Sequence, residues 1–132
     1  MMLPLTLAAL LAVDAAKPTP PKIAEPGETT LEGIYRSVSK EGDKSIVTAA
    51  TIRKAGSIYI VQWSTGTVGI GIRTSAGFSV GWTMETESGK MFRGVTVYAI
   101  KGRTLRGHWA TLPGPGRVHD ETMTWLGDIE EP

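Results

Sequence analysis

The sequence contains no cysteine, which excludes disulfide bonds, thiolate metal sites and thiol catalysis. It also has no excess of either charge, because 14 Lys and Arg stand against 13 Asp and Glu. Nucleic acid is therefore not an expected partner, since attraction to phosphate backbones needs a net positive field. After the N-terminal region, no segment carries apolar residues at helical spacing over about ten positions, which disfavours a helical domain.

The first 15 residues have the features of a secretory signal peptide. Leu3–Val13 is an apolar run, and the following Asp14-Ala15 suits cleavage after Ala15. The run is too short to span a bilayer, which needs about 20 apolar residues, so no retained membrane anchor is expected. No Lys or Arg precedes Lys17, and the alternative is an apolar N-terminal arm. The pattern predicts export to the periplasm or out of the cell.

Composition divides the rest of the chain into three parts. Residues 16–29 are rich in proline, which removes hydrogen-bond donors and fixes φ, so they are expected to form a flexible tether. Residues 30–128 have the length of one domain and are expected to form a single β-barrel. Residues 129–132 are expected to be a polar tail.

Turn signals recur about every ten residues between Thr30 and Asp128, a spacing typical of β-sandwiches and barrels. Seven connectors are predicted: 39–43, 54–57, 64–66, 74–77, 85–89, 101–103 and 112–116. Seven connectors imply eight strands. Between them apolar side chains alternate at period two, as in Phe78, Val80, Trp82 and Met84, which places alternate residues on opposite faces.

Glycines inside the predicted strands favour a barrel over a flat sandwich. Strand glycines normally weaken a sheet, but strong bending and close backbone approach in a coiled barrel need residues without a Cβ. The glycines concerned are Gly33, Gly69, Gly71, Gly81, Gly94 and Gly107. The predicted fold is all-β, an antiparallel eight-stranded up-and-down barrel.

A faint internal repeat fits this architecture. Val47–Ile52 aligns with Val95–Ile100, and in each copy a glycine-bearing turn is followed by a strand that ends in Trp63 or Trp109. Two similar four-stranded meanders, each unable to bury its apolar face alone, would close on each other. The alternative is chance similarity between short β-rich segments.

Short motifs resemble those of known barrel families. Gly33-Ile34-Tyr35 resembles the opening of lipocalins and avidins, with Tyr in place of their Trp. The segments 69–72, 80–82, 97–100, 105–109 and 116–124 resemble small exported bacterial proteins loosely described as fibronectin-binding-like. The resemblance implies an avidin-like or lipocalin-like barrel without a defined activity, and an extracellular protein as a possible partner.

Six aromatic residues are the candidate ligand-binding residues, because an eight-stranded barrel is just wide enough to hold one small ligand. Their rings would line an apolar cup, with hydroxyl and indole groups as hydrogen-bond donors. The candidates are Tyr35, Tyr59, Trp63, Trp82, Tyr98 and Trp109. The simpler interpretation is that most of them are core or barrel-closing residues.

No catalytic residue, metal site or cofactor is predicted. The serines occur outside a nucleophile elbow, and no phosphate-binding or dinucleotide-binding loop is present. A metal-assisted hydrolase at His108, His119 and Glu121 is a weaker hypothesis, because His108 would have to join the other two from a neighbouring strand.

The sequence thus predicts an exported, non-enzymatic binding module. It would hold a small apolar molecule inside the barrel, or present its loops to a protein or glycan. The alternative is an envelope inhibitor or structural protein that acts through a surface loop such as Leu112–Gly116.

Overall fold

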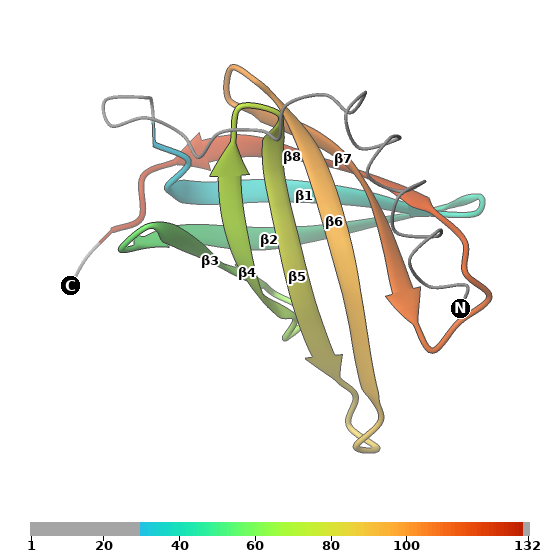
Figure 1. Ribbon diagram of the computed structural model, residues 1–132. Helices are drawn as coiled ribbons and strands as arrows, with labels where there is room; N and C mark the ends of the chain where they lie inside the picture. Colours follow the sequence, from blue (N-terminus) through green and yellow to red (C-terminus); the bar gives the residue numbers. More distant parts are fainter. Residues whose placement is uncertain (1–29, 131–132) are drawn as a thin grey trace, which may run out of the picture.

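The structure, a computed structural model, describes residues 30–130 as eight antiparallel strands closed into one barrel (Figure 1). Each strand pairs with the next along the chain, and β1 pairs with β8 to close the ring. The strands are β1 (Gly33–Glu41), β2 (Lys44–Ala55), β3 (Ile58–Trp63), β4 (Val68–Thr74), β5 (Gly77–Glu85), β6 (Met91–Lys101), β7 (Thr104–Leu112) and β8 (His119–Gly127). The predicted all-β, eight-stranded up-and-down barrel is confirmed.

Each of the seven predicted connectors falls at a junction between consecutive strands. Two of the tightest turns contain Gly42 and Gly102, at φ of 65° and 60°, a conformation that other residues adopt only with strain. The segments predicted as signal peptide and tether lie outside the described residues, as do the last two residues of the predicted tail. Residues 30–130 contain no helix long and apolar enough to cross a bilayer.

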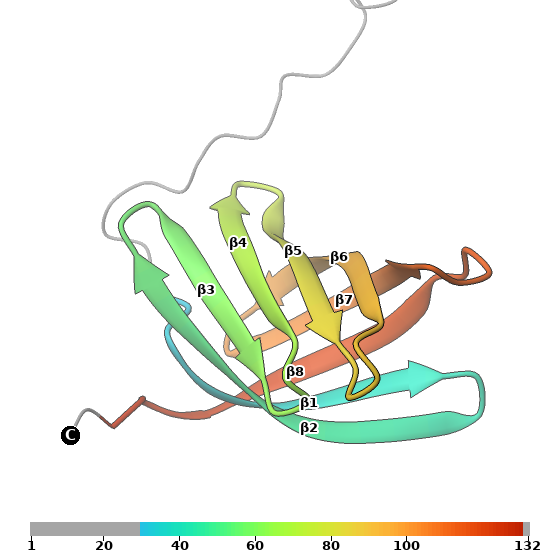
Figure 2. The ribbon, with the colours of Figure 1, turned by 90° about the horizontal axis from the view of Figure 1, so that it is seen from below.

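The strands cross the barrel in two directions. In Figures 1 and 2, β1, β2 and β8 run steeply across β4, β5 and β6, as expected for a strongly coiled small barrel. Because the topology is up-and-down, alternate connectors share an end. Connectors 42–43, 64–67, 86–90 and 113–118 lie at one end, and the other end carries connectors 56–57, 75–76 and 102–103 together with residues 30–32 and 128–130.

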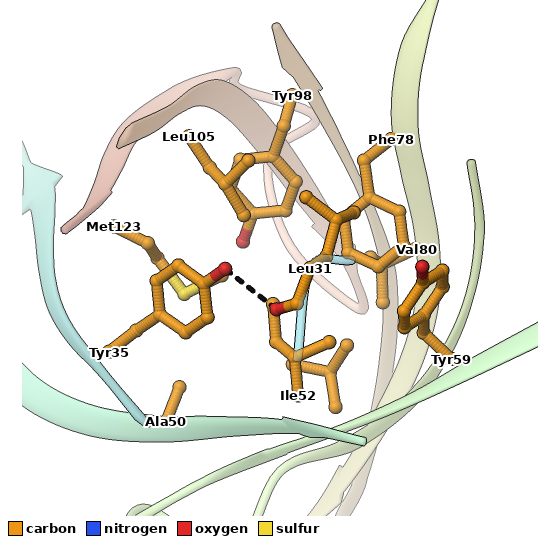
Figure 3. Packing of buried hydrophobic residues seen from close by; sticks show 11 residues of the cluster. Leu31, Tyr35, Ala50, Ile52, Tyr59, Phe78, Val80, Tyr98, Leu105 and Met123 are labelled. Atoms are coloured by element: carbon orange, nitrogen blue, oxygen red, sulfur yellow. Dashed lines mark hydrogen bonds between the residues drawn. The ribbon is translucent and has the colours of Figure 1, made fainter. Parts of the chain in front are cut away.

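The end that carries residues 30–32, hereafter the closed end, is filled by side chains. Leu31 precedes β1, is 4% exposed and lies in the middle of the cluster in Figure 3. Its carbonyl accepts a hydrogen bond from the Tyr35 hydroxyl at 2.7 Å. The buried cluster consists of Leu31, Tyr35, Ala50, Ile52, Tyr59, Val61, Phe78, Val80, Tyr98, Leu105 and Met123. At the edge of this cluster the Arg103 guanidinium lies over the Trp125 ring, 3.6 Å from the ring centre.

Strand β4 presents its aliphatic side chains to the outside. Val68, Ile70 and Ile72 are 45%, 58% and 44% exposed, whereas Gly69 and Gly71 are buried. A Cβ on Gly71 would lie 2.3 Å from the Phe78 ring, and one on Gly69 would lie 2.6 Å from a Val80 methyl group. The inner face of β4 therefore consists of backbone because the side chains of β5 occupy the space above it.

Close approach explains five of the six strand glycines singled out in the sequence. A Cβ on Gly33, Gly69, Gly71, Gly94 or Gly107 would come within 3 Å of another atom. In four of these cases the neighbour is an aromatic ring that lies over the glycine, from Trp125, Phe78, Trp82 or Tyr98. Close approach does not explain Gly81, which faces outward with no atom within 4 Å of the position that a Cβ would take.

The two segments of the faint repeat occupy equivalent places, β2 and β6, four strands apart. In both strands the threonine, Thr48 or Thr96, points toward the interior, and the preceding valine, Val47 or Val95, is exposed. The repeat therefore has the same inward and outward positions in each half of the barrel.

Candidate functional site

The end opposite the closed end is hollow. It contains a cavity of about 320 Å³ that opens between the connectors at that end, hereafter the cup. All strands except β4 contribute to its lining, as does the 64–67 connector. The lining consists of Ser39, Glu41, Ile46, Thr48, Trp63, Thr65, Thr67, Trp82, Met84, Phe92, Thr96, Trp109, Thr111 and Glu121.

Three tryptophans form much of the cup wall. Trp63, Trp82 and Trp109 reach the interior from β3, β5 and β7, since each occupies an inward position of its strand. The Trp82 and Trp109 rings meet edge to face, with their centres 6.2 Å apart. The His119 ring lies on the Trp109 ring at a tilt, with their centres 4.3 Å apart. Aromatic surface of this kind gives a ligand a large apolar contact area on rigid side chains.

A buried carboxylate lies at the base of the cup. Glu121 on β8 is 5% exposed, and its Oε2 accepts hydrogen bonds from the Ser37 hydroxyl at 2.7 Å and the Trp63 indole N–H at 3.0 Å. Both donors are neutral. A buried carboxylate is stabilised by such hydrogen bonds, but they supply no compensating positive charge.

The other two cup tryptophans differ in their polar contacts. The Trp82 indole N–H donates to the Thr96 hydroxyl at 2.9 Å, which fixes the ring across Gly94. The Trp109 indole N–H is buried and has no hydrogen-bond partner within residues 30–130. An unsatisfied buried donor costs about 1–3 kcal/mol, so this group is an unusual feature of the wall.

Tyr98 lies in the same row of paired residues as Glu121. Tyr98 pairs with Gly107 across β6 and β7, and Gly107 pairs with Glu121 across β7 and β8. Burial raises the pKa of Tyr98 well above its ordinary value, and the negative charge of Glu121 raises it further. The Tyr98 hydroxyl is therefore neutral at physiological pH. Among the described residues it lies close enough to Glu121 and Thr96 to interact with both, although neither contact has full hydrogen-bonding geometry.

The structure divides the six predicted binding residues into two sets. Trp63, Trp82 and Trp109 line the cup. Tyr35, Tyr59 and Tyr98 are outside the cup lining and belong to the packed cluster of the closed end. For these three tyrosines the simpler interpretation, a role in the core, agrees with their position.

Sequence reasoning did not assign Glu121, Thr96, Phe92 and Met84 to a ligand cavity. Glu121 lies two and four residues before Met123 and Trp125 on β8, so its side chain is on the same, inward face of the strand. The alternation of that strand therefore places Glu121 inside the barrel. Whether Phe92 and Met84 line the cup depends on how far along the barrel they lie, and the alternation of side chains does not specify this depth.

The three residues of the hydrolase hypothesis do not come together. His108 pairs with Asp120 on the outer face, with a 2.8 Å contact between Nδ1 and Oδ1 and side chains 65% and 68% exposed. His119 and Glu121 occupy inward positions of β8, so the barrel wall separates them from His108. Within residues 30–130 no group of three His, Asp or Glu side chains is arranged to hold a metal ion.

Comparison with known proteins gives no match: no family model, no curated protein and no solved structure corresponds to this chain. The functional argument therefore depends on the cup itself.

Proposed function

We propose that this protein is an exported, non-enzymatic binding module that holds one small, largely apolar ligand in the cup. The observation that carries the proposal is the hollow end itself, because the opposite end of the same barrel is filled by the buried cluster and has a much smaller pocket, of about 90 Å³, beside Leu31 and Trp125. A cavity of about 320 Å³ is at the lower limit of ligand pockets, which span about 300–1,000 Å³.

The chemistry of the lining supports binding. Six of the 14 lining residues are aromatic or aliphatic, and five of the others are threonines, whose methyl groups add apolar surface. The wall therefore combines large apolar surfaces with a few hydroxyl and carboxylate groups, as in a small-molecule site. The volume corresponds to roughly ten water molecules at about 30 Å³ each, so the ligand would have about ten non-hydrogen atoms.

Export is part of the proposal and is supported by the apolar run before Ala15. The resemblance of the Gly33-Ile34-Tyr35 opening to lipocalins and avidins supports the same type of function, since those barrels hold ligands at one end.

The proposal is tested by calorimetric titration with two probes of one shape, 2-phenylethanol and 2-phenylethylammonium. The wild-type protein is expected to bind at least one of them with one-to-one stoichiometry. Thr48→Phe places a ring inside the cup and should weaken that binding by about tenfold or more, because it fills volume that the probe needs.

The matched control is Ala49→Phe, which adds the same ring at the next position of β2, on the exposed face. It should bind like the wild type. Absence of saturable binding for both probes would overturn the proposal, as would a Thr48→Phe protein that is folded by circular dichroism and binds as tightly as the wild type.

A further inference from the structure

The charge of the cup is one-sided. Its lining contains two carboxylates, Glu121 at the base and Glu41 at the rim, and no lysine, arginine or histidine among the described residues. Two basic side chains lie next to lining rings without being part of the lining: Lys90, 5.0 Å from the centre of Phe92 at the rim, and His119, 4.3 Å from Trp109. The chain as a whole is almost neutral, so this sign is a local property of the cup. In a confined apolar cavity, where water screens poorly, charges of one sign favour a ligand of the opposite sign.

Glu121 carries most of this argument, because it is buried and its hydrogen bonds come from neutral groups. Its Oε2 is held by Ser37 and Trp63, which fixes the carboxylate in one orientation at the base of the cup. A buried charge is costly unless it is paired, and a residue needed only to satisfy Ser37 and Trp63 would not have to be charged. A bound cation would supply the missing positive charge.

The aromatic wall suits the same ligand. The face of a tryptophan ring attracts an organic cation, most strongly in a desolvated site, and three tryptophans line the same cup as this carboxylate.

We infer that the cup is specific for a small organic cation: an amine, protonated at neutral pH, attached to an apolar body of about the size of one aromatic ring. The ammonium group would contact Glu121, and the apolar body would pack between Trp63, Trp82 and Trp109. This inference rests on the proposed function and adds the chemical class of the ligand.

The test compares three probes with similar bodies and different charges: 2-phenylethylammonium, 2-phenylethanol and 3-phenylpropanoate. Titration calorimetry of the full mature chain at pH 7 should show the ammonium probe binding about tenfold or more tightly than the alcohol, because a charge-assisted contact and a cation–π contact are added. The carboxylate probe should bind more weakly than the alcohol, since it meets Glu121 with a like charge.

Glu121→Gln identifies the group responsible. The amide oxygen still accepts hydrogen bonds from Ser37 and Trp63, but the charge is removed. Affinity for the ammonium probe should fall by about tenfold, to the level of the alcohol, and affinity for the alcohol should stay within about threefold. The control Glu85→Gln removes a carboxylate on the exposed face of β5, outside the cup lining, and should leave ammonium binding within about threefold of the wild type because solvent screens its charge.

The outcomes separate the two claims. If the alcohol binds as tightly as the ammonium probe, the cation inference is wrong and the binding function stands. If none of the three probes binds, the proposed function fails as well. If folded Glu121→Gln keeps the preference for the ammonium probe, the inference is wrong about Glu121. Should this variant not fold, the three-probe comparison on the wild-type protein still decides between a cationic and a neutral ligand.

Discussion

At the scale of single residues, Gly107 shows how this barrel makes room for aromatic rings in a narrow interior. It lies between Tyr98 and Glu121 in one row of the sheet, and the Tyr98 ring occupies the space that a Gly107 side chain would need. A Cβ there would be 2.4 Å from the Val97 carbonyl oxygen and 2.7 Å from the Tyr98 ring. The position of Tyr98 beside Glu121 therefore depends on the absence of one methyl group.

Gly107→Ala should accordingly lower the free energy of unfolding by about 1–3 kcal/mol, because neither the backbone carbonyl nor the packed ring has space to move. Gly81→Ala is the matched control, since Gly81 faces outward and nothing lies within 4 Å of the added atom. It should leave stability unchanged or raise it by up to about 1 kcal/mol. Urea denaturation measures both changes, and an equal effect of the two substitutions would contradict the packing described for Gly107.

Tyr35 gives a prediction for alkaline pH. Burial, and secondarily the neighbouring Tyr59, raises the pKa of Tyr35 to about 12, from an ordinary value of 10.0. Between pH 10 and pH 12 the unfolded chain loses this proton while the folded protein keeps it. The unfolded state then binds fewer protons, so the free energy of unfolding falls as pH rises through this range.

The Tyr35→Phe protein should therefore show a shallower loss of stability between pH 10 and pH 12 than the wild type. A residual slope is expected because the pKa of Tyr98 is raised in the same direction. Urea midpoints measured at several pH values in this range give the two slopes. Parallel slopes for the wild type and Tyr35→Phe would show that the Tyr35 hydroxyl titrates normally in the folded protein.

At the scale of elements, the pairing of β1 with β8 is the seam that closes the barrel, and a hydrogen bond between side chains crosses it. Ser37 on β1 is 1% exposed and donates to Glu121 on β8. The β1–β8 register shifts between Ile34 and Tyr35, so the ladder is irregular at the closed end of this seam. The bond between Ser37 and Glu121 therefore links the two strands inside the barrel, where the base of the cup is formed.

Ser37→Ala should lower the free energy of unfolding by about 1.5–3 kcal/mol, because it removes one of the two hydrogen bonds to a buried carboxylate. Ser39→Ala, two residues along β1, should cost less than about 0.5 kcal/mol, since Ser39 lines the cup without a side-chain hydrogen bond to residues 30–130. Thermal and urea unfolding of both variants compare them. A Ser39→Ala protein as unstable as Ser37→Ala would mean that the seam does not depend on the bond to Glu121.

The elements were predictable from the sequence to different degrees. On β5 the alternation correctly groups Phe78 and Val80 on one face, and both are buried. On β4 the same alternation gives no indication of which face is inside, because Val68, Ile70 and Ile72 face solvent and two glycines face the interior. Period-two patterning separates the two faces of a strand, but only the partner strands decide which face has space for side chains.

Depth along the barrel was also beyond prediction. Trp63, Trp82 and Trp109 line the cup, whereas Tyr35, Tyr59 and Tyr98 share their inward orientation and lie outside its lining. What separates the two groups is the stagger of neighbouring strands, which sets how far each residue is from the open end. Stagger arises from long-range pairing, so a single sequence contains no direct signal for it.

At the scale of the whole molecule, the barrel is asymmetric along its length. One end is packed around Leu31 and covered by the contact between Arg103 and Trp125. The other end is hollow, with tryptophan walls above a buried carboxylate. Both ends of the described chain, residues 30–32 and 128–130, lie at the closed end, so neither obstructs the cup.

The four tryptophans report on this asymmetry. Trp63, Trp82 and Trp109 line the cup, and Trp125 lies at the closed end, where its indole N–H donates to the Glu32 carbonyl at 3.2 Å. Each indole N–H gives a separate signal in a nitrogen-15 correlation spectrum, and single Trp→Phe variants assign the signals.

Titration of the labelled protein with 2-phenylethylammonium, followed on these four signals, is the most direct test of a ligand-binding cup. The signals of Trp63, Trp82 and Trp109 should move together and saturate, while that of Trp125 should stay in place, because the packed core separates it from the cup. Four unmoved signals, or a Trp125 signal that moves as far as the other three, would contradict the account.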